Sequence, residues 1–128
     1  MEEGICGQAH VCRVGGKQTA KIGTRCMDLN TVIHELGHAI CMAHEHERHD
    51  RNQFVQLGRS ADEDDHNFEI AGSDHTTLGL LYDYESVMHY SCPAHFKPKS
   101  GAVKSCGGGD ELSVLDAEKI NAFYNCGG

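Results

Sequence analysis

The clearest hydrophobic pattern in the chain lies between residues 32 and 40. Apolar side chains recur there three and four positions apart, at Val32, Ile33, Leu36, Ala39 and Ile40. This spacing is typical of a helix with one apolar face, and Asn30 or Thr31 can cap its first turn. We therefore expect a helix that runs to about Ile40 and packs these apolar side chains into the core.

A second helix is predicted near the end of the chain. Ser113 and Asp116 have the spacing of a capping box, in which two residues satisfy each other's free backbone amides. The helix that follows would carry its apolar residues on one side, at Ala117, Ile120, Phe123 and Tyr124.

The remaining segments predict short strands and long loops. Residues 5–24 read as extended, with a turn at Gly15 and Gly16 and a second strand near Gln18 to Ile22. Residues 51–81 are predicted to be mostly loop with short helical pieces, and residues 91–112 to be loop. The expected fold class is α+β, with helices and loops outweighing the strands.

Composition narrows the class of protein. A length of 128 residues, of which 39% are hydrophobic, fits one small domain with a modest core. The net charge of -8 argues against a nucleic-acid partner. No apolar run approaches the roughly 20 residues that span a bilayer, so we predict no transmembrane segment.

Seven cysteines in so short a chain indicate an oxidising compartment and a secreted, extracellular protein. The sequence alone does not give their pairing. Cys92 and Cys106 are a candidate pair that would close a loop in the second half of the chain.

The histidines of the first predicted helix suggest a metal site. His34 and His38 are four residues apart, so both imidazoles lie on one helix face and reach one cation. Glu35 points beside that cation, where it can take a proton from a water. His44 supplies a third nitrogen only if the helix stops and the chain turns back.

Three protein ligands with one open position describe a catalytic site for one Zn²⁺ rather than a structural one. The alternative is a solvated helix face, because ten histidines make a chance His-Glu-x-x-His match plausible. The third histidine at this offset disfavours that alternative, since it matches the long metzincin signature.

Other motifs extend the match to a known family. After His44, the residues Glu45, Arg48, Asp50 and Arg51 keep the order and spacing of the astacin signature. Residues 86–90 match the Met-turn of that family letter for letter, and residues 13–18, Cys26 and 112–126 match its flanking segments. The chain therefore resembles the astacins, which are metzincin zinc endopeptidases.

The resemblance implies the metzincin zinc-protease fold. The chain would contain mainly the C-terminal subdomain, plus the last strands and the active-site helix of the N-terminal subdomain. Residues 1–128 are accordingly interpreted as an astacin-like peptidase catalytic domain, truncated at its N-terminus.

The resemblance also implies roles for individual residues. Glu35 would be the general base, and Tyr90 would ligate zinc at rest and then swing away to stabilise the transition state. Met88 would lie beneath the zinc, and Glu45 resembles the acid that anchors the mature N-terminus, a partner that this chain would lack. Four other histidines are assigned no metal: His46 and His49 as surface residues, His10 and His89 as structural ones.

By the same resemblance, Cys6 pairs with Cys26, although Cys12 competes for that role. Cys126 matches a cysteine whose partner lies in the absent N-terminal part. Cys41 replaces the glycine between the second and third ligands, where positive φ would cost a non-glycine residue about 1–2 kcal/mol. A disulfide at Cys41, a rebuilt turn, or a thiolate competing for zinc are the alternatives.

Asp28 is a second departure from one branch of the family. It stands six residues before His34, where the tolloid branch carries a basic residue that selects acidic residues after the scissile bond. An acid here argues against tolloid-like specificity.

The predicted function is that of a secreted zinc endopeptidase acting on a protein or peptide substrate. The alternative is a weak or inactive zinc-binding fragment, or pseudoprotease, that serves as a binding or structural module. The intact Glu35 favours the enzyme, whereas the absent subdomain, which forms one wall of the cleft, favours the alternative.

Overall fold

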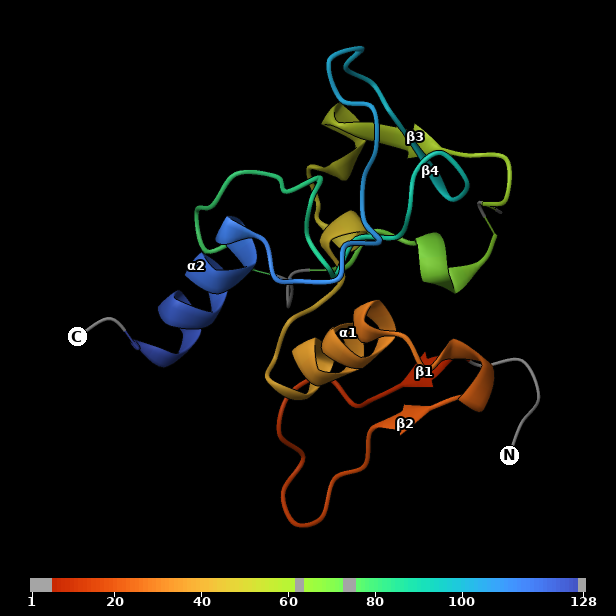
Figure 1. Ribbon diagram of the computed structural model, residues 1–128. Helices are drawn as coiled ribbons and strands as arrows, with labels where there is room; N and C mark the ends of the chain where they lie inside the picture. Colours follow the sequence, from red (N-terminus) through yellow and green to blue (C-terminus); the bar gives the residue numbers. More distant parts are fainter. Residues whose placement is uncertain (1–5, 62–63, 73–75, 127–128) are drawn as a thin grey trace.

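The computed structural model describes residues 6–61, 64–72 and 76–126. Two α-helices dominate, α1 (Leu29–Ala39) and α2 (Val114–Tyr124), with two small antiparallel sheets and short 3-10 turns between them. Figure 1 shows α1 between the N-terminal hairpin and the rest of the chain. The predicted α+β class, rich in helix and loop, is confirmed.

The N-terminal hairpin pairs β1 (Gly7–Gln8) with β2 (Lys21–Ile22), so that Gly7 lies opposite Ile22. Both strands contact α1. The second strand falls inside the predicted segment, but each strand is only two residues long. The hairpin therefore depends on α1 and on cross-links for its stability, because a two-stranded sheet is marginal in water.

α1 begins at Leu29, two residues earlier than a cap at Asn30 would allow. Asp28 is the N-cap, and its carboxylate accepts hydrogen bonds from Thr31 N at 2.9 Å and Thr31 Oγ1 at 3.0 Å. These bonds, led by the backbone amide of Thr31, lower the pKa of Asp28. The expected cap at Asn30 or Thr31 was wrong, because the Asp28 carboxylate already takes the free amide of Thr31, and Asn30 and Thr31 lie inside the first turn.

The buried face of α1 is also not the one that the apolar pattern predicted. Leu36 is 53% exposed and Ile40 is 38% exposed, whereas Glu35, Gly37 and His38 are buried. Ile33 does pack against the core. The expectation that the whole stripe enters the core was wrong, because the helix turns its polar, chemically active face inward.

A second sheet lies in segments that were predicted to be loop. β3 (Val55–Leu57) pairs antiparallel with β4 (Phe96–Pro98), with Leu57 opposite Phe96. Val55 and Phe96 are fully buried and share a core cluster with Phe68 and Tyr82. Three-residue strands carry too little alternation to be recognised from sequence, and their pairing partner is far along the chain.

A second core cluster lies beneath α1 and consists of Met42, Val87 and Met88. Asp116 of α2 is fully buried there and accepts hydrogen bonds from Ser86 Oγ at 2.6 Å and Val87 N at 2.9 Å. This carboxylate therefore fixes the segment before Tyr90 to the last helix.

The predicted capping box of α2 is present. Ser113 Oγ accepts from Asp116 N at 2.9 Å, and Asp116 accepts in return from Ser113 N at 3.2 Å. Ile120 packs against the core, but Phe123 and Tyr124 are largely exposed. The apolar side of α2 is thus narrower than its sequence pattern predicted.

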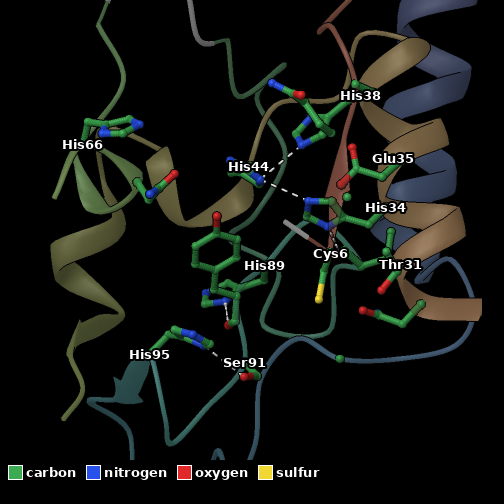
Figure 2. Close-up of a pocket in the computed structure, with 18 residues that line it drawn as sticks. Cys6, Thr31, His34, Glu35, His38, His44, His66, His89, Ser91 and His95 are labelled. Carbon is green, nitrogen blue, oxygen red and sulfur yellow. Dashed lines mark hydrogen bonds between the residues drawn. The ribbon is translucent and has the colours of Figure 1, made fainter. Parts of the chain in front are cut away.

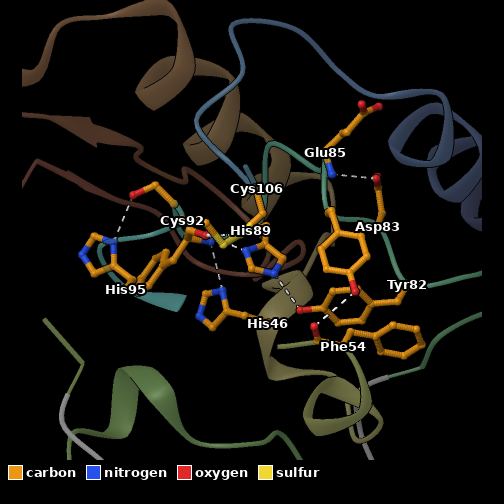
Figure 3. The surroundings of a disulfide bond; sticks show 12 residues. His46, Phe54, Tyr82, Asp83, Glu85, His89, Cys92, His95 and Cys106 are labelled. Carbon is orange, nitrogen blue, oxygen red and sulfur yellow. Dashed lines mark hydrogen bonds between the residues drawn. A yellow bond between two sulfur atoms is a disulfide. The ribbon is translucent and has the colours of Figure 1, made fainter. Parts of the chain in front are cut away.

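Three disulfides are present in the described part of the chain. Cys6–Cys26 and Cys92–Cys106 are the expected pairs, and the third joins Cys12 to Cys41. Cys106 is buried in the aromatic core, and Figure 3 shows the Cys92–Cys106 bridge close to His46 and His89. Cys126 is exposed and unpaired among the described residues.

Candidate metal centre and active site

The three predicted ligands converge on one point. His34 Nε2 and His38 Nε2 each lie 3.1 Å from His44 Nε2, as Figure 2 shows. Nitrogens bound to one tetrahedral zinc at about 2.0–2.1 Å stand about 3.3–3.4 Å apart. The donor set therefore fits a single zinc ion with little rearrangement.

The other ring nitrogens hold the imidazoles in the orientation that a metal requires. His34 Nδ1 donates to Val87 O at 2.8 Å, and His38 Nδ1 donates to Met42 O at 2.9 Å. With the proton fixed on Nδ1, the Nε2 lone pair faces the centre. Burial lowers the pKa of His34, and lowers that of His38 to about 4, which keeps both in the neutral ligand form.

A tight reversal after α1 brings the third ligand back. Met42 N donates to Gly37 O at 2.9 Å, and Cys41 N donates to His38 O at 3.0 Å. Cys41 has φ of 78°, the left-handed conformation that favours glycine. The chain then returns toward the face of α1 that carries His34, and His44 reaches the other two ligands.

The sequence left three alternatives for Cys41: a disulfide, a rebuilt turn or a thiolate that competes for zinc. The structure shows the disulfide. Its partner Cys12 also has positive φ, 67°, and Cys12 N donates to His38 O at 2.9 Å. Cys12 and Cys41, both with positive φ, thus donate to the same carbonyl, His38 O, and are joined by a disulfide. The bridge ties the N-terminal hairpin to the turn between the second and third ligands.

Glu35 lies beside the three nitrogens in a nearly closed position. It is 6% exposed, and its Oε2 has no hydrogen-bond partner among the described residues. Gly7 of β1 covers it so closely that a side chain at residue 7 would overlap Glu35 Oε1. Burial raises the pKa of Glu35. A buried carboxylate oxygen with no partner suits a water held between it and a metal.

Tyr90 lines the same cavity. Its ring centroid lies 5.1 Å from that of His44 and 4.1 Å from that of His46. Burial raises its pKa, so the phenol is a neutral hydrogen-bond donor at neutral pH. Its role as a metal ligand stays a prediction.

Met88 is fully buried against α1. A Cβ at Gly37, the residue just before His38, would lie 2.6 Å from Met88 Sδ. Glycine at position 37 is therefore needed for the close packing of Met88 under the ligand-bearing helix, and the sequence match to a Met-turn has a packing basis.

The prediction that His46 is a surface residue was wrong. It is fully buried, Tyr90 N donates to its Nδ1 at 3.3 Å, and its Nε2 donates to Asn67 O at 3.2 Å. Its ring stacks on His44 with centroids 4.8 Å apart. With both nitrogens committed, His46 supports the third ligand and has no lone pair left for a second metal shared with His44 and Glu47.

Two of the other histidine assignments agree with the structure: His49 is exposed, and His89 is buried in a structural role. His10, which was expected to be structural, is exposed. His89 Nδ1 donates to Tyr90 O at 2.5 Å, so its Nε2 accepts from Tyr82 OH at 2.6 Å. Burial lowers the pKa of His89 to about 4, which keeps it neutral.

Glu45 has partners of its own in the described part of the chain, whatever pairs with it from the N-terminus. It is 1% exposed and forms ion pairs with Arg48 at 3.2 Å and with Lys119 of α2. Asp83 N also donates to Glu45 Oε1 at 2.9 Å. A lysine 74 residues further along the chain therefore helps to compensate this buried charge, which no local pattern indicates.

An open cavity of about 770 Å³ surrounds the three ligands and Glu35. One side is the β1 edge, from Gly7 to Ala9, and the opposite side includes His66, Asn67 and His95. His66 and Asn67 lie in the short 3-10 helix η4 (His66–Phe68), and His95 lies in the turn before β4. The sequence analysis did not identify these three residues, because only the fold brings their segments to the cavity and no local motif marks them.

Three imidazole nitrogens around one point, with a buried glutamate beside them, form a donor set that fits the zinc site of the His-Glu-x-x-His class. The profile of the Astacin peptidase family matches residues 1–125, and the chain belongs to that family.

The chain is similar in sequence to known members of this family. The chain is 37% identical to zinc metalloproteinase nas-8 of Steinernema carpocapsae, over 91% of this chain and 30% of that protein. It is 34% identical to embryonic protein UVS.2 of Xenopus laevis, over 98% of this chain and 26% of that protein. The chain thus spans less than a third of the length of these two relatives.

A solved structure shares the fold. High choriolytic enzyme 1, a hatching enzyme zinc-protease from Oryzias latipes (medaka fish), superposes with a TM-score of 0.84 at 28% identity. The superposition covers 98% of this chain and 67% of that one. Within the described residues, no helix is both long and apolar enough to cross a membrane.

Proposed function

We propose that the chain is the zinc-binding part of a secreted endopeptidase that hydrolyses peptide bonds. The observation that carries this proposal is the convergence of His34, His38 and His44 beside a buried Glu35 whose Oε2 has no partner among the described residues. A merely structural zinc site has four protein ligands and needs no base beside it.

The chain's own residues divide the work of hydrolysis. When bound, zinc polarises the scissile carbonyl and lowers the pKa of a water toward about 7. Glu35 accepts a proton from the attacking water and passes it to the leaving amine. Its burial, which raises its pKa, suits it to both steps.

Tyr90 is proposed to contact the reacting carbonyl and zinc. Its neutral phenol lies next to His44 and can donate a hydrogen bond to the oxyanion that develops during attack. The substrate is proposed to be a protein or peptide that lies in the open cavity along the β1 edge, where backbone groups offer strand pairing.

The three disulfides support a secreted, extracellular location. We further propose that residues 1–128 form part of a peptidase catalytic domain, because 98% of the chain superposes on 67% of the medaka hatching enzyme.

Cleavage of a denatured, unstructured protein tests the proposal. We expect the purified, oxidised chain to cut such a substrate, to stop when a zinc chelator is added, and to recover when zinc is restored. Zinc uptake without any cleavage would contradict the enzyme and support the alternative, a zinc-binding module. Cleavage that resists the chelator would contradict the metal mechanism.

A further inference from the structure

The third ligand is held differently from the other two. His34 and His38 lie on α1, and each donates its Nδ1 proton to a neutral backbone carbonyl. His44 lies outside α1, at the N-cap of the 3-10 helix η2 (Glu45–Glu47). Its Nδ1 lies 3.1 Å from Glu47 Oε1, so this ligand alone among the three has a carboxylate partner in the hydrogen bonds described.

Glu47 is fixed in place by its own backbone. Glu47 N donates to His44 O at 3.2 Å, and Glu47 O accepts from Ala71 N at 2.7 Å. The three-residue offset within a 3-10 turn places the two side chains on the same face. Because the ring of His44 also stacks on the buried His46, the imidazole is held on its face and at its Nδ1 edge.

We propose that Glu47 is a positioning residue for the metal, acting through His44; this inference rests on the proposed zinc site. The carboxylate keeps the proton on Nδ1, aims the Nε2 lone pair at the metal and makes the imidazole a stronger donor. His44 needs this support more than the other ligands, because an irregular segment, rather than a helix, carries it. Glu47 thereby contributes to zinc affinity without touching the metal.

Zinc affinity measured by competition with a chromophoric chelator tests the proposal. We expect Glu47→Ala to bind Zn²⁺ about 10–100-fold more weakly than the wild type, the range typical of a lost outer-shell partner. Glu47→Gln keeps an oxygen that accepts from Nδ1, so it should retain part of the affinity. Glu118→Ala, an exposed glutamate on α2 outside the cavity, is the matched control and should bind within twofold of the wild type.

Two further readouts separate positioning from general stability. The visible spectrum of the cobalt(II)-substituted protein should change in Glu47→Ala, while the unfolding midpoint of the metal-free variant stays close to that of the metal-free wild type. Wild-type affinity in Glu47→Ala, or an equal loss in Glu47→Ala and Glu47→Gln, would overturn the inference. A wild-type chain that takes up no zinc would instead remove the proposed function, and the inference with it.

Discussion

Replacing Glu35 with glutamine is expected to reduce peptide-bond cleavage by about 10²–10⁴-fold, the range for loss of a general acid–base group. Glutamine keeps the shape of the side chain beneath Gly7 but cannot accept the proton of the attacking water. The three imidazoles do not depend on Glu35 for their hydrogen bonds. Zinc content should therefore stay at the wild-type level, and the loss should appear in kcat.

Glu85→Gln is the matched control for this variant. Glu85 is exposed beside the Met-turn segment, and its replacement makes the same chemical change outside the cavity. It should leave cleavage and zinc content unchanged. If Glu35→Gln retains more than a tenth of the wild-type rate, then Glu35 is not the base.

The second large effect is expected at the Cys12–Cys41 bridge. Removing a cross-link between residues 29 apart costs about 3.5 kcal/mol in the chain-entropy account. Two different pairs of replacements remove this bridge, and we expect them to differ in stability. Cys12→Gly with Cys41→Gly loses the bridge but adopts both positive φ values freely, whereas Cys12→Ala with Cys41→Ala also retains an unfavourable φ at both positions.

Denaturant unfolding of the two double variants measures the difference. We expect the alanine pair to be less stable than the glycine pair by about 1–2 kcal/mol at each position. Equal stability of the two pairs would contradict the argument from backbone conformation. A glycine pair as stable as the wild type would show that the bridge contributes nothing to the folded state.

Local spacing made the metal ligands readable from the sequence. His34 and His38 are adjacent on a helix, Glu35 necessarily points beside them, and the capping box of Ser113 and Asp116 is likewise a short-range pattern. Each of these features is decided within one or two helical turns, where the period of the backbone fixes which side chains meet.

The features that the sequence did not reveal are long-range. The Cys12–Cys41 bridge joins residues 29 apart, and the Lys119–Glu45 ion pair joins residues 74 apart. The hydrogen bond that fixes His46 also depends on Asn67, a residue of the separate 3-10 helix η4. Their common cause is tertiary packing, which brings together groups whose local sequence carries no sign of the partner.

The buried face of α1 was also not predictable from the sequence pattern. The apolar pattern found the helix, but it assigned Leu36 and Ile40 to the core, where the structure instead buries Glu35 and His38. Hydrophobic periodicity assumes that the apolar side faces inward. A helix that carries a metal site breaks this rule, because its function requires the polar face to be enclosed.

The central claim is that His34, His38 and His44 together hold one zinc ion. A crystal structure of the oxidised protein with zinc, with data collected at the zinc absorption edge, tests it most directly. We predict one fully occupied zinc bonded to the three Nε2 atoms at about 2.0–2.1 Å. Zinc occupancy below about a tenth, or a bound zinc that leaves out His44, would contradict the account.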